Sequence, residues 1–421
     1  MKKKPYRAVD VKEVDVKKLG EQVRGREVVI GVDVGKEQMY ASVRDRGEEV
    51  RVTVKWRHPW ETAEAVKRLA GLPGAKVEVA MEPSGTYGDS VREAFRQAGV
   101  KVYRVGAKRS HDAAEVYDGV PSLHDGKSCA IIAQLHGEGV SREWEPASEG
   151  DRELGAAGGV MTMYEGMYRQ GINRLEAQLG RHWPELGEVL GLGTVTMLVL
   201  LMRYPGPQEV GGAGEKAAEL MRRTGGGLLK EETIQAVVST ARQTVGVAMV
   251  EAEKEAMRVL VREVWRAQRK AKKAKEKVAG LGEREEGVKA QAEVVGRATA
   301  AVLRHAVGDA REYPSAEGYV KGMGLNLKVK SSGMKKGQLK ITKRGPGIAR
   351  KYLYYAVMRL IQSDEVIGAW YARKVARDGG AKGWAMVAVM RKLAQGLWHV
   401  GRGAVFDSRK LFDVKRLGLC E

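Results

Sequence analysis

The sequence predicts three structural parts: an amino-terminal α/β domain, a helical middle part that contains a coiled coil, and a mainly α-helical carboxy-terminal domain. Short apolar runs alternate with helical segments over residues 27–150, as expected for a sheet covered by helices. Apolar residues recur at spacings of three and four between residues 257 and 281, a pattern typical of a coiled coil. Helical patterns dominate beyond residue 291.

The expected domain boundaries follow from changes in amino-acid composition along the chain. Residues 1–26 are rich in lysine and are expected to form a basic leader with little structure. The α/β domain, the helical region and the last domain are predicted at residues 27–150, 151–290 and 291–421, with the coiled coil at about residues 250–282. The last domain is expected to contain helices at residues 346–362, 365–377 and 384–400.

The α/β domain begins with an apolar run, EVVIGVDVG at residues 27–35, which predicts a buried strand. Hairpin neighbours of this strand are predicted at residues 39–44 and 49–55. The remaining elements alternate between helix and strand, at residues 61–69, 77–82, 88–98 and 100–105 and after residue 124. Three strands followed by helix, strand, helix, strand and helix is the element order of a ribonuclease-H-like α/β domain.

The middle part contains one unusually regular apolar seam. Its members are Met257, Leu260, Val264, Ala267, Ala271, Ala274, Val278 and Leu281. Lys and Arg cover the other faces of this predicted helix, as in a coiled coil. Two interpretations stay open, a contact between subunits and a long amphipathic helix packed on its own domain.

The chain has an excess of positive charge, with 73 Lys and Arg against 53 Asp and Glu, a formal net charge of +20 and a pI near 9.7. Such an excess attracts polyanions, and nucleic acid is the usual partner. No apolar run approaches the roughly 20 residues of a membrane helix, and the basic start lacks the apolar stretch of a signal peptide. Cys129 and Cys420 form no disulfide or zinc pattern, so a cytoplasmic protein without a membrane partner is expected.

Three carboxylates stand at the ends of predicted elements. Asp33 closes the first strand, Glu82 closes a later strand, and Asp125 opens the helix after residue 124. In a ribonuclease-H-like sheet these ends converge on one edge, where carboxylates repel each other unless a cation neutralises them. Hard oxygen ligands suit Mg²⁺, which assists phosphoryl transfer. The alternative for each single residue is ordinary turn chemistry.

A one-sided basic segment surrounds residue 332. Between Gly318 and Ser363 there are eleven Lys or Arg and no Asp or Glu, whereas a solvated face usually mixes the two signs. Ser331 and Ser332 lie in the middle of this predicted loop, and a hydroxyl there could attack a phosphodiester if a base or a metal activates it. The candidate nucleic-acid ligands of the loop are Lys328, Lys330, Lys335, Lys336, Lys340, Lys343 and Arg344.

Two glycine-bearing turns precede apolar helices, LGLGTVT at residues 190–196 and VGRAT at residues 295–299. Both look like helix-hairpin-helix elements, in which backbone amides at a helix start can bind a phosphate. The alternative is an ordinary connection between two helices.

Taken together, these motifs resemble the Piv/MooV-type DEDD transposases, the insertion-sequence one-ten family and its one-one-one-one relatives. The resemblance extends over about residues 27–410 and rests on separated motifs in a fixed order. They are GVDVGK at residues 31–36, MEPSGTY at 81–87, HDGK at 124–127, the segment 294–309, GLN through SSG at 324–333, ITKRG at 341–345 and the helix at 386–394.

The resemblance implies a RuvC-like domain that supplies four acids and a carboxy-terminal transposase domain that supplies a serine. Matched by motif, the first three acids fall on Asp33, Glu82 and Asp125, and the serine falls on Ser332, with Ser331 as the second choice. The implied mechanism uses Mg²⁺ held by the carboxylates and a covalent serine–DNA intermediate. The implied partners are donor and target DNA, a structured non-coding guide RNA called the bridge RNA, and further copies of the chain, as a dimer or tetramer. In a tetramer of this kind, RuvC-like and serine domains of different protomers form one site, and the seam at residues 257–281 is the expected subunit contact.

One position departs from the family pattern. The fourth acid is expected three residues after the third, one helical turn along, and here that position holds Ser128. A hydroxyl is a weaker, neutral metal ligand, so metal affinity is expected to fall; Asp118 or Asp112 are conceivable substitutes. Two alternatives to a recombinase therefore stay open, a RuvC-like nuclease that uses water as its nucleophile and a nucleic-acid-binding relic without activity.

Overall fold

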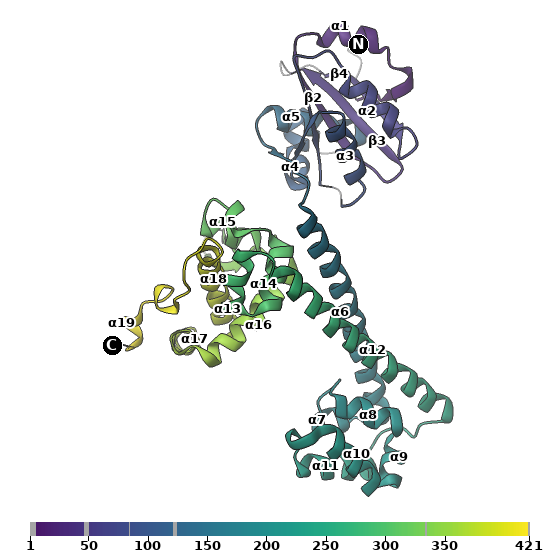
Figure 1. Ribbon diagram of the computed structural model, residues 1–421, viewed down its shortest axis with the longest axis vertical. Helices are drawn as coiled ribbons and strands as arrows, with labels where there is room; N and C mark the ends of the chain where they lie inside the picture. Colours follow the sequence, from purple (N-terminus) through teal and green to yellow (C-terminus); the bar gives the residue numbers. More distant parts are fainter. Residues whose placement is uncertain (1–5, 46–49, 84, 121–123, 333–334, 420–421) are drawn as a thin grey trace. The chain divides into compact units, whose positions relative to one another are not determined.

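The computed structural model describes residues 6–45, 50–83, 85–120, 124–332 and 335–419, and the side chains of residues 329–338 lie outside this description. The chain divides into two compact units, Met1–Pro146 and Ala147–Glu421. The first unit has a mixed α/β sheet, and the second is largely helical (Figure 1). Within the described residues, no helix is long and apolar enough to cross a membrane.

The sheet of the first unit has the strand order β1-β4-β3-β2-β5-β6-β7. Strands β2, β3 and β4 are antiparallel neighbours, whereas β2, β5 and β6 run parallel, so β2 lies between a meander and a parallel half. The short strand β1 runs parallel to β4, and β7 runs antiparallel to β6. The bounds of β1 to β7 are Val9–Asp10, Glu27–Val34, Gln38–Asp45, Val50–Arg57, Lys76–Met81, Lys101–Arg104 and Arg142–Glu143.

Helices cover both faces of this sheet because the side chains of its central strands alternate between two cores. Val79 and Met81 of β5 belong to the core under α1, α2 and α3, whereas Ala80 belongs to the core under α4 and α5. The bounds of α1 to α5 are Val16–Val23, Thr62–Ala70, Asp89–Gln97, Ala107–Asp118 and Asp125–Gly137. The result is a three-layer α/β unit.

Helix α5 crosses β2 at a very close distance. A Cβ atom at Gly31 would overlap the carbonyl oxygen of Cys129 and would lie 2.8 Å from the Cβ atom of Ala133. Only glycine leaves room for this approach. The contact fixes the position of α5, and therefore of its first residue, Asp125, relative to the end of β2.

All eight elements predicted in the α/β domain are present, with ends that shift by a few residues. The prediction of little structure in residues 1–26 was wrong for residues 9–23, which form β1, a short 3-10 helix at Val11–Glu13, and α1. Leu19 and Val23 lie on one face of α1 and are buried against the sheet. The charged residues of the leader occupy the other face and conceal this apolar spacing. Helix α4 was not predicted either.

Two long helices form the spine of the second unit, α6 (Glu149–His182) and α12 (Glu251–Gly282). They run antiparallel, because contacts pair the end of one with the start of the other: Arg181 with Glu253, Gly171 with Val264, and Glu153 with Arg284. Figure 1 shows the two helices side by side. The apolar seam of α12 therefore packs against its own chain, and the predicted use of this seam as a subunit contact was wrong for the residues that α6 covers.

The two ends of this spine carry separate helical cores. One core gathers side chains from α6 and α12 together with α7 to α11, which span Leu186–Val189, Val195–Arg203, Pro207–Ala213, Glu215–Gly225 and Glu231–Gln243. The other core is built from α13 to α18 and receives side chains near α19. Bounds of α13 to α19 are Glu286–Val295, Arg297–Val307, Ala316–Gly322, Gly347–Ser363, Glu365–Arg377, Lys382–Val400 and Val414–Leu417, so the three helices predicted here are confirmed.

The close contact between α5 and β2 can be tested with Gly31→Val. We expect this substitution to destabilise the fold by about 3 kcal/mol, because its side chain would overlap backbone atoms that cannot rotate away. Urea unfolding of the full chain measures the loss, and hydrogen exchange should rise locally in β2 and α5. Gly137→Ala at the other end of α5 is the matched control and should change stability by less than about 0.5 kcal/mol, because its Cβ atom would meet open space. Equal stability of the two variants would contradict this account.

Candidate functional site

The three predicted carboxylates lie at one edge of the first sheet. Asp33 is near the end of β2, and Glu82 directly follows β5. Because β2 and β5 run parallel with Val32 beside Met81, the next residues on each strand, Asp33 and Glu82, leave the sheet side by side. Asp125 is the first residue of α5, the helix that crosses β2 at Gly31.

The three carboxylates are close enough for their charges to influence one another. The pKa of the partly buried Asp33 carboxyl is raised to about 6, first by burial and then by the negative charges of Glu82 and Asp125. Tyr40 lies opposite Asp33 on β3, and burial together with Asp125 and Asp33 raises the pKa of its phenol. The edge of the sheet is therefore a region of excess negative potential in an otherwise basic protein.

A network of buried contacts holds the start of α5. The Nδ1 atom of His124, the residue before the helix, accepts a hydrogen bond of 3.2 Å from the backbone N–H of Lys127. The buried Lys127 ammonium donates to Asp118 (2.6 Å) and to the carbonyl of Val120 (2.5 Å). Tyr6 in the leader also donates to Asp118, at 3.1 Å. Together these bonds tie the segment before α5 to the helix that carries Asp125.

A buried arginine lies below Glu82. Arg92 of α3 donates to the backbone carbonyl of Glu82 at 3.4 Å, pairs with Asp89, and lies 5.7 Å from the ring centroid of Trp144. Arg92 is only 4% exposed, so its guanidinium fixes the end of β5 from inside the domain. Sequence reasoning missed Arg92, Lys127, Tyr6 and Tyr40. Two of these had a sequence signal: the predicted hairpin places Tyr40 near Asp33, and Lys127 closes the HDGK motif at residues 124–127.

Ser128, the residue at the position expected for a fourth acid, lies one turn after Asp125 on α5 and is partly buried. Asp118 and Asp112, the conceivable substitutes for the fourth acid, are both engaged elsewhere. Asp118 is engaged by Lys127 and Tyr6, and Lys127 lowers the pKa of its carboxyl, whereas Asp112 pairs with Lys108 on the exposed side of α4. The site therefore has three carboxylates and one hydroxyl.

The donor chemistry of this edge fits a hard cation. Three carboxylates and a hydroxyl are oxygen ligands of the type that Mg²⁺ prefers. Burial and, after it, the charges of Glu82 and Asp125 raise the pKa of Asp33, and a cation would relieve that repulsion. Among the residues that the structure describes, no three His, Cys, Asp or Glu side chains are already gathered at metal-binding geometry. Binding would therefore require the three carboxylates to move closer together.

The basic segment of the second unit forms a hairpin, so the expectation of a loop is corrected. Strands β8 (Leu327–Ser332) and β9 (Lys335–Ile341) pair antiparallel, and Ser332 faces Lys335 in the register. Of the candidate ligands, Lys328, Lys340, Lys343 and Arg344 are exposed. The side chains of Ser331, Ser332, Lys330, Lys335 and Lys336 lie outside the described residues. Because lysines alternate with other residues in this segment, it has no apolar periodicity from which strands could be predicted.

Backbone contacts anchor the base of this hairpin. Thr342 donates through its N–H to the carbonyl of Asn326 at 2.8 Å and through its hydroxyl to the Asn326 side chain at 2.5 Å. Arg350 of α16 donates to the carbonyls of Met323 (3.0 Å) and Gly345 (2.9 Å). Residues 323–345 are therefore fastened at both ends to the helical core.

The two glycine-bearing turns differ in their surroundings. The turn before α8 is packed into the spine, because a Cβ atom at Gly193 would overlap the Tyr168 hydroxyl, and Gln268 donates to the Gly193 carbonyl at 2.9 Å. This turn is an ordinary packed connection. The turn before α14, with Gly296 at φ +82°, borders a cavity of about 620 Å³ that is also lined by Lys275 and Arg359.

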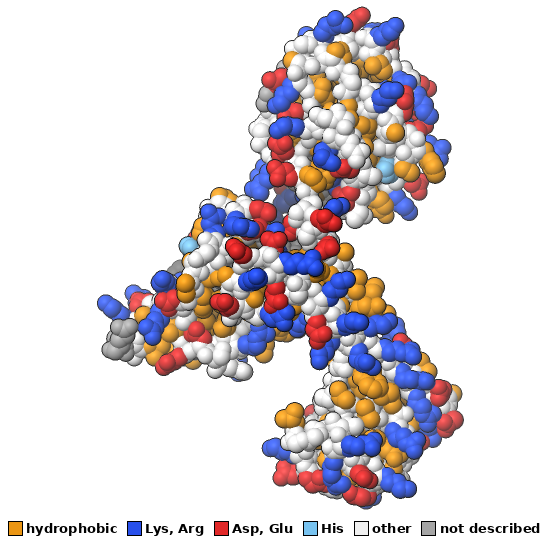
Figure 2. Space-filling view, viewed as in Figure 1, with side chains coloured by type: hydrophobic (Ala, Val, Ile, Leu, Met, Phe, Trp, Pro, Cys, Tyr) orange, Lys and Arg blue, Asp and Glu red, His pale blue; other side chains and the backbone are white. Residues whose placement is uncertain are grey.

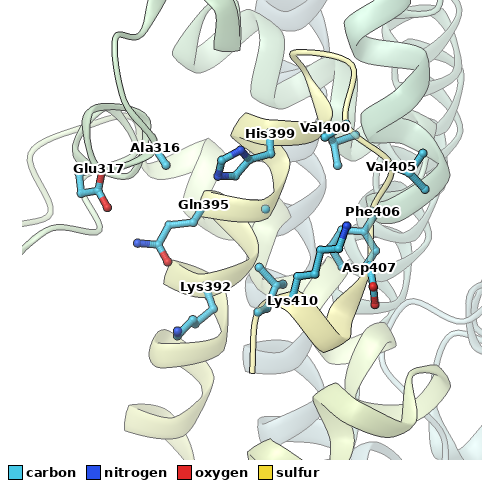
Figure 3. Close-up of a pocket in the computed structure, with 13 residues that line it drawn as sticks. Ala316, Glu317, Lys392, Gln395, His399, Val400, Val405, Phe406, Asp407 and Lys410 are labelled. Carbon is cyan, nitrogen blue, oxygen red and sulfur yellow. The ribbon is translucent and has the colours of Figure 1, made fainter. Parts of the chain in front are cut away.

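Another cavity, of about 490 Å³, opens between α18 and the segment that follows it (Figure 3). Lys392, Gln395 and His399 project from α18, and Asp407 and Lys410 come from the next segment. None of the predicted site residues whose side chains the structure describes lines this cavity. The side chains that line it carry charges of both signs, and none of them is a nucleophile paired with a base. The carboxylate edge is therefore the better candidate for a catalytic centre.

The raised pKa of Asp33 predicts how stability changes with pH in metal-free buffer containing EDTA. Because the folded value of about 6 lies above the roughly 3.9 of an unfolded aspartate, the folded state binds the proton more tightly. Stability is therefore lost as the pH rises from about 4 through 6. Asp33→Asn should be more stable than the parent by about 2 kcal/mol at pH 7.5 and nearly equal to it at pH 4, measured by urea unfolding. Glu145→Gln is the exposed control; the same difference at both pH values for Asp33→Asn would contradict the assignment.

Comparison with known families identifies the second unit. Residues 290–372 match the family model described as the Transposase IS116/IS110/IS902 family, a stretch that includes the hairpin and the helices α14 to α16. No curated protein matches the chain. Over these residues the chain is similar to insertion-sequence transposases of that family.

Proposed function

We propose that the chain is an RNA-guided DNA recombinase that cuts and rejoins DNA through a covalent serine–DNA intermediate, aided by a carboxylate-bound Mg²⁺. The observation that carries the proposal is the convergence of Asp33, Glu82 and Asp125 at one sheet edge, where burial and then the charges of Glu82 and Asp125 raise the pKa of Asp33. In a protein with a net charge of +20, such a cluster of like charges indicates a cation-dependent site.

A RuvC-like, ribonuclease-H-like fold for the first unit is part of this proposal. The strand order supports it: an antiparallel meander of β2, β3 and β4 adjoins parallel strands β5 and β6 on the other side of β2. Helices on both faces complete the arrangement. Asp33 and Glu82 lie at the carboxyl ends of the central parallel strands, and Asp125 opens α5. Ligands of open α/β sheets bind at such ends.

Asp33, Glu82 and Asp125 would hold the Mg²⁺, with Ser128 as a neutral ligand or a ligand to a bound water. When bound, the ion supplies a positive charge that stabilises the negative charge of a phosphodiester under attack. The protein's own contribution is to hold the carboxylates together against their repulsion. Lys127 does so by holding the start of α5, and Arg92 does so by holding the end of β5.

The serine supplies the nucleophile in this proposal. The Ser332 Oγ–P bond forms while the bond from phosphorus to a deoxyribose oxygen breaks, and the hydroxyl proton ends on the departing oxygen. Because one phosphodiester replaces another, bond energy is kept for rejoining, and the reverse reaction with a different DNA end completes recombination. The exposed Lys328 and Lys340, paired across the hairpin, would bind flanking phosphates.

The guide RNA and the oligomer, a dimer or tetramer, complete the proposal. The surplus of Lys and Arg gives the chain capacity for a second polyanion besides DNA. Since the α12 seam is covered by α6, subunits would associate through other surfaces.

One observation favours a second candidate. Ser128 leaves the site one negative charge short, which weakens metal binding and would suit a nucleic-acid-binding protein with little activity. A nuclease that uses water instead of the serine is separated from the recombinase by its products, since hydrolysis leaves no covalent protein–DNA species.

Ser332→Ala tests the nucleophile. The full chain is incubated with Mg²⁺, the RNA encoded beside its gene and DNA carrying the element ends, and covalent adducts are resolved on a denaturing gel. We expect the parent to form an adduct and Ser332→Ala to lose it, because no oxygen is left to bond to phosphorus. Ser331→Ala is the matched control and should retain the adduct. Loss in Ser331→Ala alone would move the nucleophile by one residue, and cleaved DNA without an adduct in the parent would contradict the serine mechanism.

Ser128→Asp tests the metal site. Restoring the fourth carboxylate should strengthen Mg²⁺ binding roughly tenfold, because affinity rises with ligand charge, and adduct yield at limiting Mg²⁺ should rise with it. Isothermal titration calorimetry measures the binding without reference to activity. Ser128→Asn has the same size without the charge and should bind as the parent does. Equal binding by Ser128→Asp and Ser128→Asn would argue against a site at this edge.

A further inference from the structure

The two halves of helix α12 differ in how their charges are balanced. In the first half, Arg258 lies within ion-pair distance of Glu251 and Glu255, and Arg266 pairs with Glu263 at 2.6 Å. This pattern of alternating signs is that of an ordinary solvated helix face.

The second half carries six cations and one acid between residues 269 and 277. The cations are Arg269, Lys270, Lys272, Lys273, Lys275 and Lys277, all exposed, and the acid is Glu276. Within the described part of the chain, no carboxylate forms an ion pair with any of the six, in contrast to the arginines of the first half. Like charges one turn apart destabilise a helix, so this arrangement costs stability unless an external polyanion binds it.

Three of these cations lie on the face of α12 opposite the seam that contacts α6, and a fourth borders that face. The seam toward α6 includes Ala267, Ala274 and Val278. At 100° per residue, Arg269, Lys272 and Lys273 lie on the opposite side together with Glu276, and Lys277 lies at the edge of that side. We call these four cations the α12 cationic row. Figure 2 shows Lys and Arg gathered along α12. The row extends about 12 Å along the helix.

The other two cations face neighbouring aromatic rings. Lys270 lies 5.3 Å from the ring centroid of Tyr164, and Lys275 lies 5.6 Å from that of Tyr352. Single-stranded nucleic acid is usually bound by several exposed aromatic side chains on which successive bases stack. The aromatic ring beside the row, the partly buried Trp265, is covered by Arg269 at 6.0 Å from its centroid. A row of lysine and arginine side chains without ion-pair partners instead matches the regularly spaced phosphates of a duplex.

We propose that the α12 cationic row is a second DNA-binding surface, which contacts the phosphate backbone of duplex DNA independently of its sequence. The choice of DNA rests on the proposed function, because a recombinase must hold the duplex on both sides of the position that it cuts. Charge complementarity supports the choice, since four cations with a single acid, Glu276, among them match a run of phosphates. The row is distinct from the hairpin at β8 and β9 and from the carboxylate edge.

The experiment measures binding of the full chain to a fluorescein-labelled duplex of arbitrary sequence by fluorescence anisotropy, at several salt concentrations in EDTA. The test variant is Arg269→Gln with Lys272→Gln, Lys273→Gln and Lys277→Gln, since glutamine is about as favourable in a helix as lysine. The matched control removes four exposed cations from the first unit, by Lys17→Gln, Lys18→Gln, Arg24→Gln and Lys67→Gln. Both variants lose the same net charge, and circular dichroism verifies that each is folded.

We expect the test variant to bind duplex DNA at least about tenfold more weakly and its salt dependence, the slope of log K against log salt, to fall by about 4, one for each lost phosphate contact. The control should keep the slope of the parent. An unchanged slope in the test variant, or an equal change in both variants, would overturn the inference. So would a loss confined to an RNA duplex of the same sequence. If the parent itself binds no duplex DNA, the proposed function fails as well, so the two failures are distinguishable.

Discussion

The contact between α5 and β2 is the constraint on which the first unit and its candidate site depend. Gly31 lets the helix lie directly on the strand, and the helix brings Asp125 to the edge where β2 ends with Asp33. Any side chain at Gly31 would lift the helix and move Asp125 away from its partners. The same contact brings carboxylates together, so packing free energy from the core offsets their electrostatic repulsion.

That repulsion gives the serine at position 128 a physical meaning. A fourth carboxylate on α5 would add a like charge beside a group whose pKa is already raised. With Ser128 the apo fold is under less electrostatic stress, and the attraction for a cation is smaller for the same reason. At this edge, a side chain at position 128 that raises the affinity for metal therefore lowers the stability of the metal-free fold, and the reverse also holds.

Local patterns predicted much of the first unit, and long-range contacts account for most of what they missed. The apolar run of β2 and the acids at strand ends are properties of a few adjacent residues. Helix α4 buries only Ser110 and Ala114, too few for a clear period. The seam of α12 showed which face is apolar but not that α6 covers it, because periodicity carries no information about the partner. Tyr6 reaches the site through its hydrogen bond to Asp118, a contact between distant parts of the chain that no spacing reveals.

The antiparallel spine of α6 and α12 has a consequence for how this chain can change in evolution. The chain leaves along one helix and returns along the other, so residues 183–250 form an inserted lobe at the far end of a hairpin about 48 Å long. Deleting residues from one helix alone would rotate the apolar seam away from its partner. Matched deletions of seven residues from both helices would keep the seam aligned. The distance between the two helical cores can therefore vary among descendants only in discrete, coupled steps.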